Sequence, residues 1–177
     1  MGGETSDDGR RCAAAPTAGH EPATAPVRSF DSLSVGDRFA LGTFTVTRES
    51  IVDFARRFDP QPFHLDEAAA RASMFGGLVA SGLHTLSETF AVAVRSGIWS
   101  EANLAGAGLD ELRWPRPVRP GDVLSVAIEV VALTPSRSRP DRGIARIRYV
   151  ATNREGEPAL SFTIDHVLRR DAGGGGA

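Results

Sequence analysis

The strongest constraint on the fold is a helix expected at residues 81–96, because its later turns are apolar on almost every side. Apolar side chains recur at helical spacing and are expected to form its core stripe: Leu83, Leu86, Phe90, Ala93 and Val94. Ala91 and Val92 widen this stripe. A helix of this kind is normally buried on most of its sides. The rest of the chain must therefore supply a surface that wraps around it.

Strand patterns supply such a surface. From Leu124 to Val130, apolar residues alternate with small or polar ones, which is typical of a strand with one face in the core. Further strands are expected at residues 38–46, 143–153 and 159–169. One largely apolar helix followed by consecutive antiparallel strands indicates an α+β fold, in which an antiparallel sheet wraps around a long central helix.

Length and composition indicate one folded domain, at residues 29–171. Residues 1–28 have few core-forming side chains and predict a disordered tail, and the glycine-rich residues 172–177 predict a flexible end. The net charge of −2 argues against a nucleic-acid-binding protein. A single cysteine, Cys12, suits a reducing compartment, and no apolar run is long enough for an export signal or a membrane span. We therefore expect a cytoplasmic protein.

Residues 58–64, Phe-Asp-Pro-Gln-Pro-Phe-His, place a carboxylate and an imidazole close together. They follow a helix expected to start at an N-cap, Thr47, and to end near Phe58. Each proline fixes its own φ and pushes the preceding residue toward an extended conformation, so we expect a stiff loop holding Asp59 and His64. A histidine beside an orienting carboxylate is a recurrent device for activating water. Spacing alone also fits a plain helix-terminating loop, and by itself it favours that interpretation.

A longer motif changes this balance. The sequence FARRFDPQPFHLDEAAARASMFGGLVASG, which ends at Gly82, resembles the hydratase signature of the MaoC-like acyl dehydratases, hot-dog proteins related to (R)-specific enoyl-CoA hydratases. The signature's acid is Asp59, its histidine is His64, its alanines are residues 68–70, and its helix-opening glycine is Gly82. More loosely, the resemblance extends from about residue 29 to residue 170.

The resemblance implies a hot-dog fold and reversible hydration of a trans-2-enoyl-CoA thioester to a 3-hydroxyacyl-CoA. It assigns Asp59 and His64 as the acid/base pair and Gly82 as the oxyanion donor, with Ser81 nearby in the substrate pocket. It also implies an acyl-CoA substrate, a homodimer, and no cofactor or metal. Some members carry a serine that bonds the catalytic aspartate where Phe90 stands here, so we expect Ser87 or Thr89 to replace it. Pro60-Gln61 and Ser81 also depart from the best-known members, in which Gln61 is an asparagine and Ser81 a histidine.

The role of Gly82 also has a physical basis. A glycine that opens a helix has a backbone N–H with no partner within the helix, at the positive end of the helix dipole. Without a Cβ it lets a thioester oxygen approach closely. Taken alone, the same glycine fits simple relief of crowding at a helix start equally well. The Asp59–His64 pair in register with it favours the donor role.

Two other functions remain open from the sequence. Some hot-dog thioesterases use a carboxylate on the central helix, and Glu88 lies on the helix expected here. A thioesterase would release free CoA thiol, whereas a hydratase would give a hydroxyacyl thioester. The third possibility is a non-catalytic acyl-CoA-binding partner subunit, which would bind an enoyl-CoA without turning it over; the presence of both Asp59 and His64 counts against it.

Other polar residues carry weaker signals. Arg137, Arg139 and Arg142 could meet the phosphates of CoA, but a solvated turn is the favoured interpretation. Adjacent residues on a strand point to opposite faces, so Asp165 and His166 are not expected to cooperate. For His84, a satisfied core histidine is favoured over a pocket residue. The sequence has no metal-ligand spacing and no phosphate-binding glycine loop.

Overall fold

The computed structural model describes residues 29–99 and 101–171 of the 177-residue chain. The predicted tails, residues 1–28 and 172–177, lie outside the described residues, as does Cys12. In the described part of the chain, no helix is both long and apolar enough to cross a membrane. After a short 3-10 helix, Phe30–Ser32, five strands form one antiparallel sheet in the order β1-β3-β4-β5-β2.

Three long strands form the middle of the sheet: β3 (Val123–Pro135), β4 (Arg142–Thr152) and β5 (Pro158–Arg169). Inward and outward residues alternate along them, and the inward side chains form much of the apolar core. Strand β1 (Arg38–Thr45) pairs with β3 at one edge. These four strands confirm the sequence predictions, although β3 continues five residues beyond Val130.

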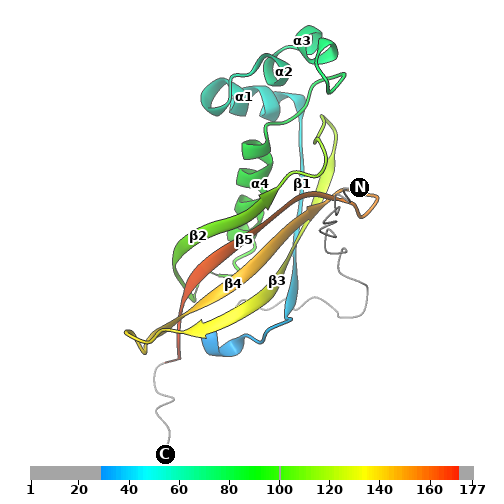
Figure 1. Ribbon diagram of the computed structural model, residues 1–177. Helices are drawn as coiled ribbons and strands as arrows, with labels where there is room; N and C mark the ends of the chain where they lie inside the picture. The colour runs from blue at the N-terminus through cyan, green and yellow to red at the C-terminus, as the bar shows by residue number, and fades with distance from the viewer. Residues whose placement is uncertain (1–28, 100, 172–177) are drawn as a thin grey trace, which may run out of the picture.

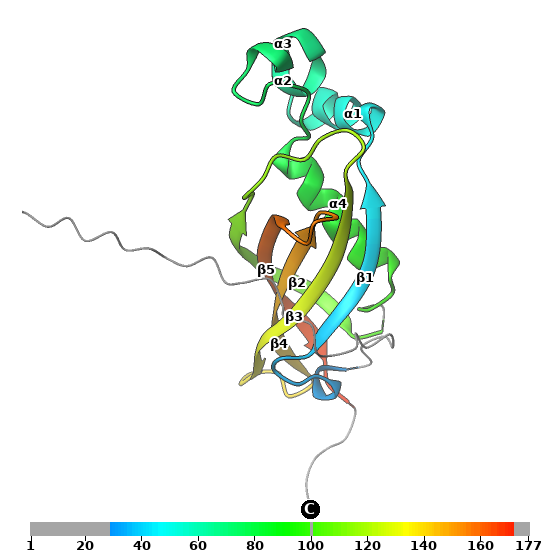
Figure 2. The ribbon, with the colours of Figure 1, turned by 90° about the vertical axis from the view of Figure 1, so that its right-hand side faces the viewer.

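Helix α4 (Gly82–Arg95) runs along one face of the sheet, which curves around it (Figures 1 and 2). This is the hot-dog arrangement, and the predicted α+β fold is confirmed. The predicted core stripe of the helix is wrong in part, because Leu83, Phe90 and Val94 are exposed. The helix instead turns a partly polar face to the core: His84, Thr85, Thr89, Val92 and Ala93.

The two buried threonines explain how a polar helix face can be buried. Thr89 Oγ1 donates a hydrogen bond to the carbonyl oxygen of Thr85 at 2.8 Å, and Thr85 Oγ1 donates to the carbonyl oxygen of Ser81 at 3.3 Å. A hydroxyl that bonds its own helix backbone is satisfied without a partner elsewhere, so its burial costs little. Hydrophobic periodicity cannot detect this arrangement, since it counts threonine as a surface residue.

Strand β2 (Asn103–Arg113) was not predicted from the sequence. Within the described chain it pairs only with β5, at the edge of the sheet, and almost every residue in it is exposed. Residues 105–108 of the strand are alanine and glycine, which have low strand propensity and give no alternation of apolar and polar side chains. The strand exists because of its hydrogen bonds to β5, with register shifts at three places.

Three short helices connect β1 to α4 and gather beyond one end of the sheet (Figure 1). Helix α1 (Arg48–Phe58) has the predicted N-cap, Thr47, whose hydroxyl accepts a hydrogen bond from the Ser50 N–H. Helix α3 (Glu67–Ala72) begins at Asp66. The predicted loop before it is correct only as far as Gln61, because Pro62–Leu65 form a further short helix, α2. A proline at the first helical position is compatible with a helix start, since its missing N–H would have no partner there.

Candidate active site

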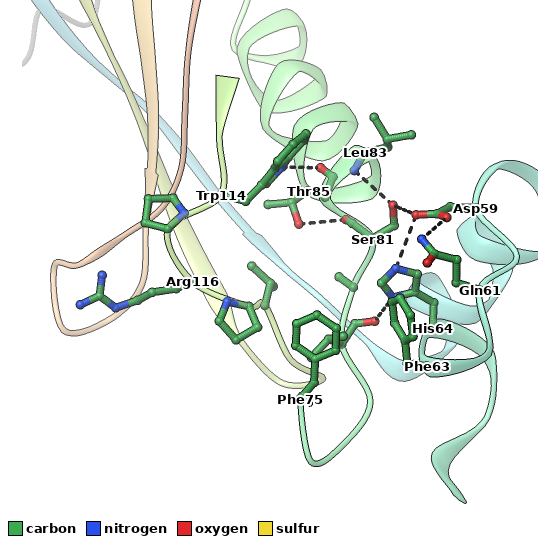
Figure 3. Close-up of a pocket in the computed structure, with 16 residues that line it drawn as sticks. Asp59, Gln61, Phe63, His64, Phe75, Ser81, Leu83, Thr85, Trp114 and Arg116 are labelled. Atoms are coloured by element: carbon green, nitrogen blue, oxygen red, sulfur yellow. Dashed lines mark hydrogen bonds and ion pairs between the residues drawn. The ribbon is translucent and has the colours of Figure 1, made fainter. Parts of the chain in front are cut away.

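A cavity of about 450 Å³ lies at the end of the sheet where α2 meets the start of α4 (Figure 3). The segment that follows β2 closes its other side. Most of the lining is apolar, and its few polar groups lie mainly on the α2 and α4 side. The lining residues are Asp59, Gln61, Phe63, His64, Phe75, Val79, Ala80, Ser81, Gly82, Leu83, Thr85 and residues 114–118. Apolar pockets with a few convergent polar groups are typical of small-molecule sites.

Asp59 is held by three neighbours at the end of α1. The Ser81 hydroxyl donates to Asp59 Oδ2 at 2.6 Å, and the Gln61 side-chain amide donates to Oδ1 at 2.8 Å. His64 Nε2 lies 3.4 Å from Oδ2. The hydrogen bond from Ser81 is the main reason why the pKa of Asp59 lies below its usual range; Gln61 and His64 lower the pKa further, and partial burial opposes them. Asp59 is therefore a carboxylate at neutral pH.

His64 is buried, with 5% of its surface exposed, and its ring is fixed from one side. Nδ1 lies 2.7 Å from the backbone carbonyl oxygen of Val79. A carbonyl oxygen can only accept, so Nδ1 carries the hydrogen of this bond. In the neutral ring, Nε2 then presents a lone pair toward Asp59. Two acceptors, the lone pair and the carboxylate, consequently face the same space at the cavity wall.

Gly82 is the first residue of α4, and its carbonyl oxygen accepts a 2.9 Å hydrogen bond from Trp114 Nε1. The indole lies so close that a Cβ at position 82 would come within 2.6 Å of Trp114 Cε2. Only glycine fits there without a shift. Ser81 caps the helix by accepting from the Leu83 N–H at 3.2 Å. Among the residues that the structure describes, the Gly82 N–H has no hydrogen-bond partner.

The cavity thus combines two kinds of polar group. On one wall, a carboxylate and an imidazole nitrogen can each accept a hydrogen from a molecule that lies beside both. At the start of α4, an unpaired N–H at the positive end of a helix dipole can stabilise a developing negative charge. An acid/base pair with a nearby oxyanion donor suits proton transfer to or from a carbon near a carbonyl group.

Comparison with known proteins identifies the group to which this site belongs. Residues 34–151 match the MaoC-like domain. The chain belongs to the MaoC-like domain family. A MaoC-like dehydratase from Rhodospirillum rubrum, known from a crystal structure, is 46% identical in sequence, with a TM-score of 0.75 over 80% of this chain and 97% of that one.

Two curated relatives each match this chain over more than two thirds of their own length. The uncharacterized protein YdeM of Bacillus subtilis is 32% identical over 140 residues, which are 79% of this chain and 98% of that protein. The 3-hydroxybutyryl-CoA dehydratase of Methylorubrum extorquens is 33% identical over 115 residues, which are 62% of this chain and 68% of that protein. The resemblance inferred from the motif is thus confirmed at the level of the family.

In this MaoC-like chain, the four predicted site residues all line one cavity: Asp59, His64, Ser81 and Gly82. The expected partner of the aspartate is wrong, because Ser87 and Thr89 donate to carbonyl oxygens of their own helix. Ser81 bonds Asp59 instead. The hydroxyl of the helix cap already points toward the end of α1, whereas those two residues lie further along α4 and engage the carbonyl four residues back.

The residues with weaker signals lie away from the cavity. Glu88 does not line it and pairs with Arg95 at 3.3 Å. The arginines at 137–142 lie at the β3–β4 turn, at the opposite end of the sheet (Figure 1). Asp165 and His166 point to opposite faces as predicted, since Asp165 pairs with Arg146 while His166 is buried.

His84 corrects another expectation. It is buried and stacks on Phe54 with ring centroids 4.9 Å apart, as a core residue would. Its Nδ1, however, is buried without a hydrogen-bond partner, so the prediction of a satisfied histidine is wrong. Burial lowers the pKa of His84, which keeps the ring neutral.

Several residues of the site escaped the sequence analysis: Trp114, Phe75 and the carbonyl of Val79. Trp114 follows the unpredicted strand β2, so nothing in the chain order placed it beside Gly82. A backbone carbonyl has no sequence signal at all. For a metal, among residues 29–99 and 101–171 no group of three or more His, Cys, Asp or Glu side chains is arranged to hold an ion.

Proposed function

We propose that this MaoC-like protein adds water reversibly to a trans-2-enoyl-CoA thioester, giving a 3-hydroxyacyl-CoA. The proposal depends most on one observation, the two acceptors that face each other at 3.4 Å on the cavity wall. A water molecule can donate one hydrogen to His64 Nε2 and the other to Asp59 Oδ2. Its oxygen lone pairs are then left free to attack a carbon in the cavity.

The chemical step follows from this placement. The water oxygen bonds to C3 of the enoyl thioester while its proton passes to His64 Nε2. The electrons of the C2–C3 double bond shift toward the thioester, and negative charge develops on its oxygen. The proton then returns to C2, which completes the addition of water. The Asp59 carboxylate orients the water and stabilises the imidazolium that forms.

Gly82 is the proposed donor to the thioester oxygen. Its N–H has no other partner in the described chain, and Trp114 holds the next peptide group of the same residue through the Gly82 carbonyl. A single oxyanion donor is typically worth about 3 kcal/mol of barrier. Since the Ser81 hydroxyl already donates its hydrogen to Asp59, we propose that Ser81 positions the carboxylate rather than binding the thioester.

The substrate class has two supports. The cavity is mostly apolar, which suits an acyl chain. A relative of similar length, from Methylorubrum extorquens, is named a 3-hydroxybutyryl-CoA dehydratase. Together they favour an acyl-CoA thioester over a substrate without an apolar chain.

Loss of the enoyl-thioester absorbance, followed with crotonyl-CoA, tests the proposal. Asp59→Asn and His64→Ala are each expected to lower turnover at least about a hundredfold, a typical loss for a general acid or base, without unfolding the protein. Asp53→Asn, at an exposed acid on α1, is the matched control and should leave the rate unchanged. Near-normal rates in either site variant would contradict the assignment, and release of free thiol would indicate a thioesterase instead.

We also propose that the protein works as a homodimer. The edge strand β2 is exposed, including Leu104 and Leu109, and α4 exposes Leu83, Phe90 and Val94. Exposed sheet edges and apolar patches are usually covered in stable proteins. Sedimentation equilibrium should give the mass of two chains; the mass of one chain would contradict the dimer. A cytoplasmic location stays a prediction from the sequence.

A further inference from the structure

The cavity has two distinct ends. The start of α4 and the indole of Trp114 lie at one end, and Phe63 and Phe75 lie at the other, with His64 between them (Figure 3). A thioester oxygen placed at the Gly82 N–H, with its C3 beside His64, directs the later carbons of the acyl chain toward the two phenylalanines. In this placement, the two rings face the end of the acyl chain that is farthest from the thioester.

Phe75 lines this end and belongs to a chain of ring contacts. Its ring lies 5.3 Å from that of Phe63, centroid to centroid, and Phe63 in turn meets the ring of His64 edge-on at 4.5 Å. Both phenylalanines are partly buried. An acyl chain that continues past His64 soon meets aromatic side chains, so its length is limited unless Phe75 moves.

The position of Phe75 depends on the opposite wall of the cavity. Phe75 belongs to the loop between α3 and α4, and Arg119 Nη2 donates to its carbonyl oxygen at 2.7 Å. The other terminal nitrogen of Arg119 lies along the same loop, 3.2 Å from where a Cβ on Gly77 would be. Arg119 directly follows the wall residues 114–118, and its backbone N–H donates to Asp122 Oδ2 at 2.8 Å. The arginine thus ties one wall to the other.

We propose that Phe75 determines substrate specificity by limiting acyl length, and that Arg119 is a positioning residue that holds Phe75 in place. The inference rests on the proposed hydratase function and deepens it. It names the substrate class as short-chain enoyl thioesters.

The first test compares kcat/KM for crotonyl-CoA, trans-2-hexenoyl-CoA and trans-2-octenoyl-CoA. Wild type should prefer crotonyl-CoA. Phe75→Ala should raise the octenoyl-to-crotonyl ratio by about tenfold or more, because each methylene that gains room in an apolar pocket is worth roughly tenfold or more. Phe75→Leu should give a smaller rise, and it serves if the alanine variant does not fold. Met74→Ala is the matched control, since Met74 precedes Phe75, is 93% exposed and does not line the cavity.

The second test concerns Arg119. Arg119→Ala should raise the same ratio by a smaller factor, while Arg119→Lys should restore the wild-type ratio because an ammonium group can still donate to the Phe75 carbonyl. An equal loss of rate with all three substrates, without a change in the ratio, would mean that Arg119 supports the fold only and would overturn its positioning role.

Binding separates this inference from the proposed reaction. Calorimetric titration with butyryl-CoA and octanoyl-CoA needs no turnover, and Phe75→Ala should tighten binding of octanoyl-CoA alone. If wild type hydrates no enoyl-CoA but the variant still gains this affinity, the proposed hydratase reaction is contradicted and the role of Phe75 in limiting acyl length is supported. If wild type is active but the variant's ratio and binding match those of wild type, the role of Phe75 is contradicted. If neither ligand binds, both fail.

Discussion

Two polar clusters lie at opposite ends of α4, and each contains a buried histidine. Near the amino end, His64 has one nitrogen bonded to the main chain, while the other faces a carboxylate and the cavity. Beyond the carboxyl end, His166 is 1% exposed, and both its nitrogens have neutral partners: the Tyr149 hydroxyl at 2.7 Å and Asn103 Oδ1 at 3.2 Å. The same residue type is thus set up for chemistry at one end and for packing at the other.

The direction of each hydrogen bond at the second cluster can be worked out. Trp99 Nε1 can only donate, and it donates to the Tyr149 hydroxyl at 3.0 Å. The hydroxyl hydrogen is then free to point at His166 Nε2, which leaves the ring hydrogen on Nδ1, facing Asn103. Burial lowers the pKa of His166 to about 4 and raises the pKa of Tyr149. Burial of a histidine therefore does not distinguish a catalytic role from a packing role. The second ring nitrogen does, because that of His64 faces the cavity whereas that of His166 has a neutral hydrogen-bond partner.

The largest expected effect concerns acid stability and the His166 cluster. The ordinary histidine pKa is about 6.5. Above this pH the ring is neutral in both states; as the pH falls toward 4, only the unfolded chain gains the proton, so stability is lost across that window. At about 1.4 kcal/mol per pKa unit, the loss from this group totals about 3–4 kcal/mol. Urea unfolding at several pH values should show a smaller loss in His166→Gln. An unchanged pH dependence would mean that the cluster does not exclude the proton.

The next effect concerns the start of α4. Gly82→Ala forces the Trp114 indole or the helix to move, because the new Cβ would come within 2.6 Å of the ring. Overpacking of this kind typically costs about 1–3 kcal/mol of stability, and a displaced donor should lower turnover roughly a hundredfold. Thermal unfolding and crotonyl-CoA hydration measure the two effects. Asp53→Asn, the exposed control on α1, should change neither. A fully active Gly82→Ala enzyme would remove Gly82 from the mechanism.

The smallest expected effect concerns Ser81, which positions Asp59. Ser81→Ala removes the hydrogen bond that contributes most to the low pKa of Asp59, so that pKa should rise. Because the mechanism needs the carboxylate, the acid limb of the kcat/KM profile should move to higher pH. The lost helix cap should cost about 1 kcal/mol of stability. Ser81→Thr keeps a hydroxyl and should largely restore the profile; an acid limb that stays in place in Ser81→Ala would show that the limb does not report Asp59.

Features carried by local sequence were predictable. The helix cap at Thr47 is a side-chain acceptor at the first turn, and this residue type is visible in the sequence. The Asp59–His64 pair follows from two prolines that keep the chain extended before α2. The motif then placed Gly82 with them, and the structure brings all three to one cavity.

Features that depend on distant contacts were not predictable. Strand β2 has no pattern of its own and exists through pairing with β5, so the residue after it, Trp114, could not be placed against Gly82. The buried face of α4 was misjudged because threonines bonded to their own backbone behave as core residues. Arg119 reaches the Phe75 loop across 44 positions in the sequence, and no local rule connects them.

The bond between His64 and the carbonyl of Val79 has an evolutionary consequence. A peptide oxygen is common to every amino acid, so no exchange of the side chain at position 79 can delete it. Mutation is free to alter that valine within the limits of packing while the imidazole keeps its hydrogen on the same nitrogen. The protonation pattern of this histidine is therefore inherited through the course of the main chain, not through the identity of a neighbouring residue.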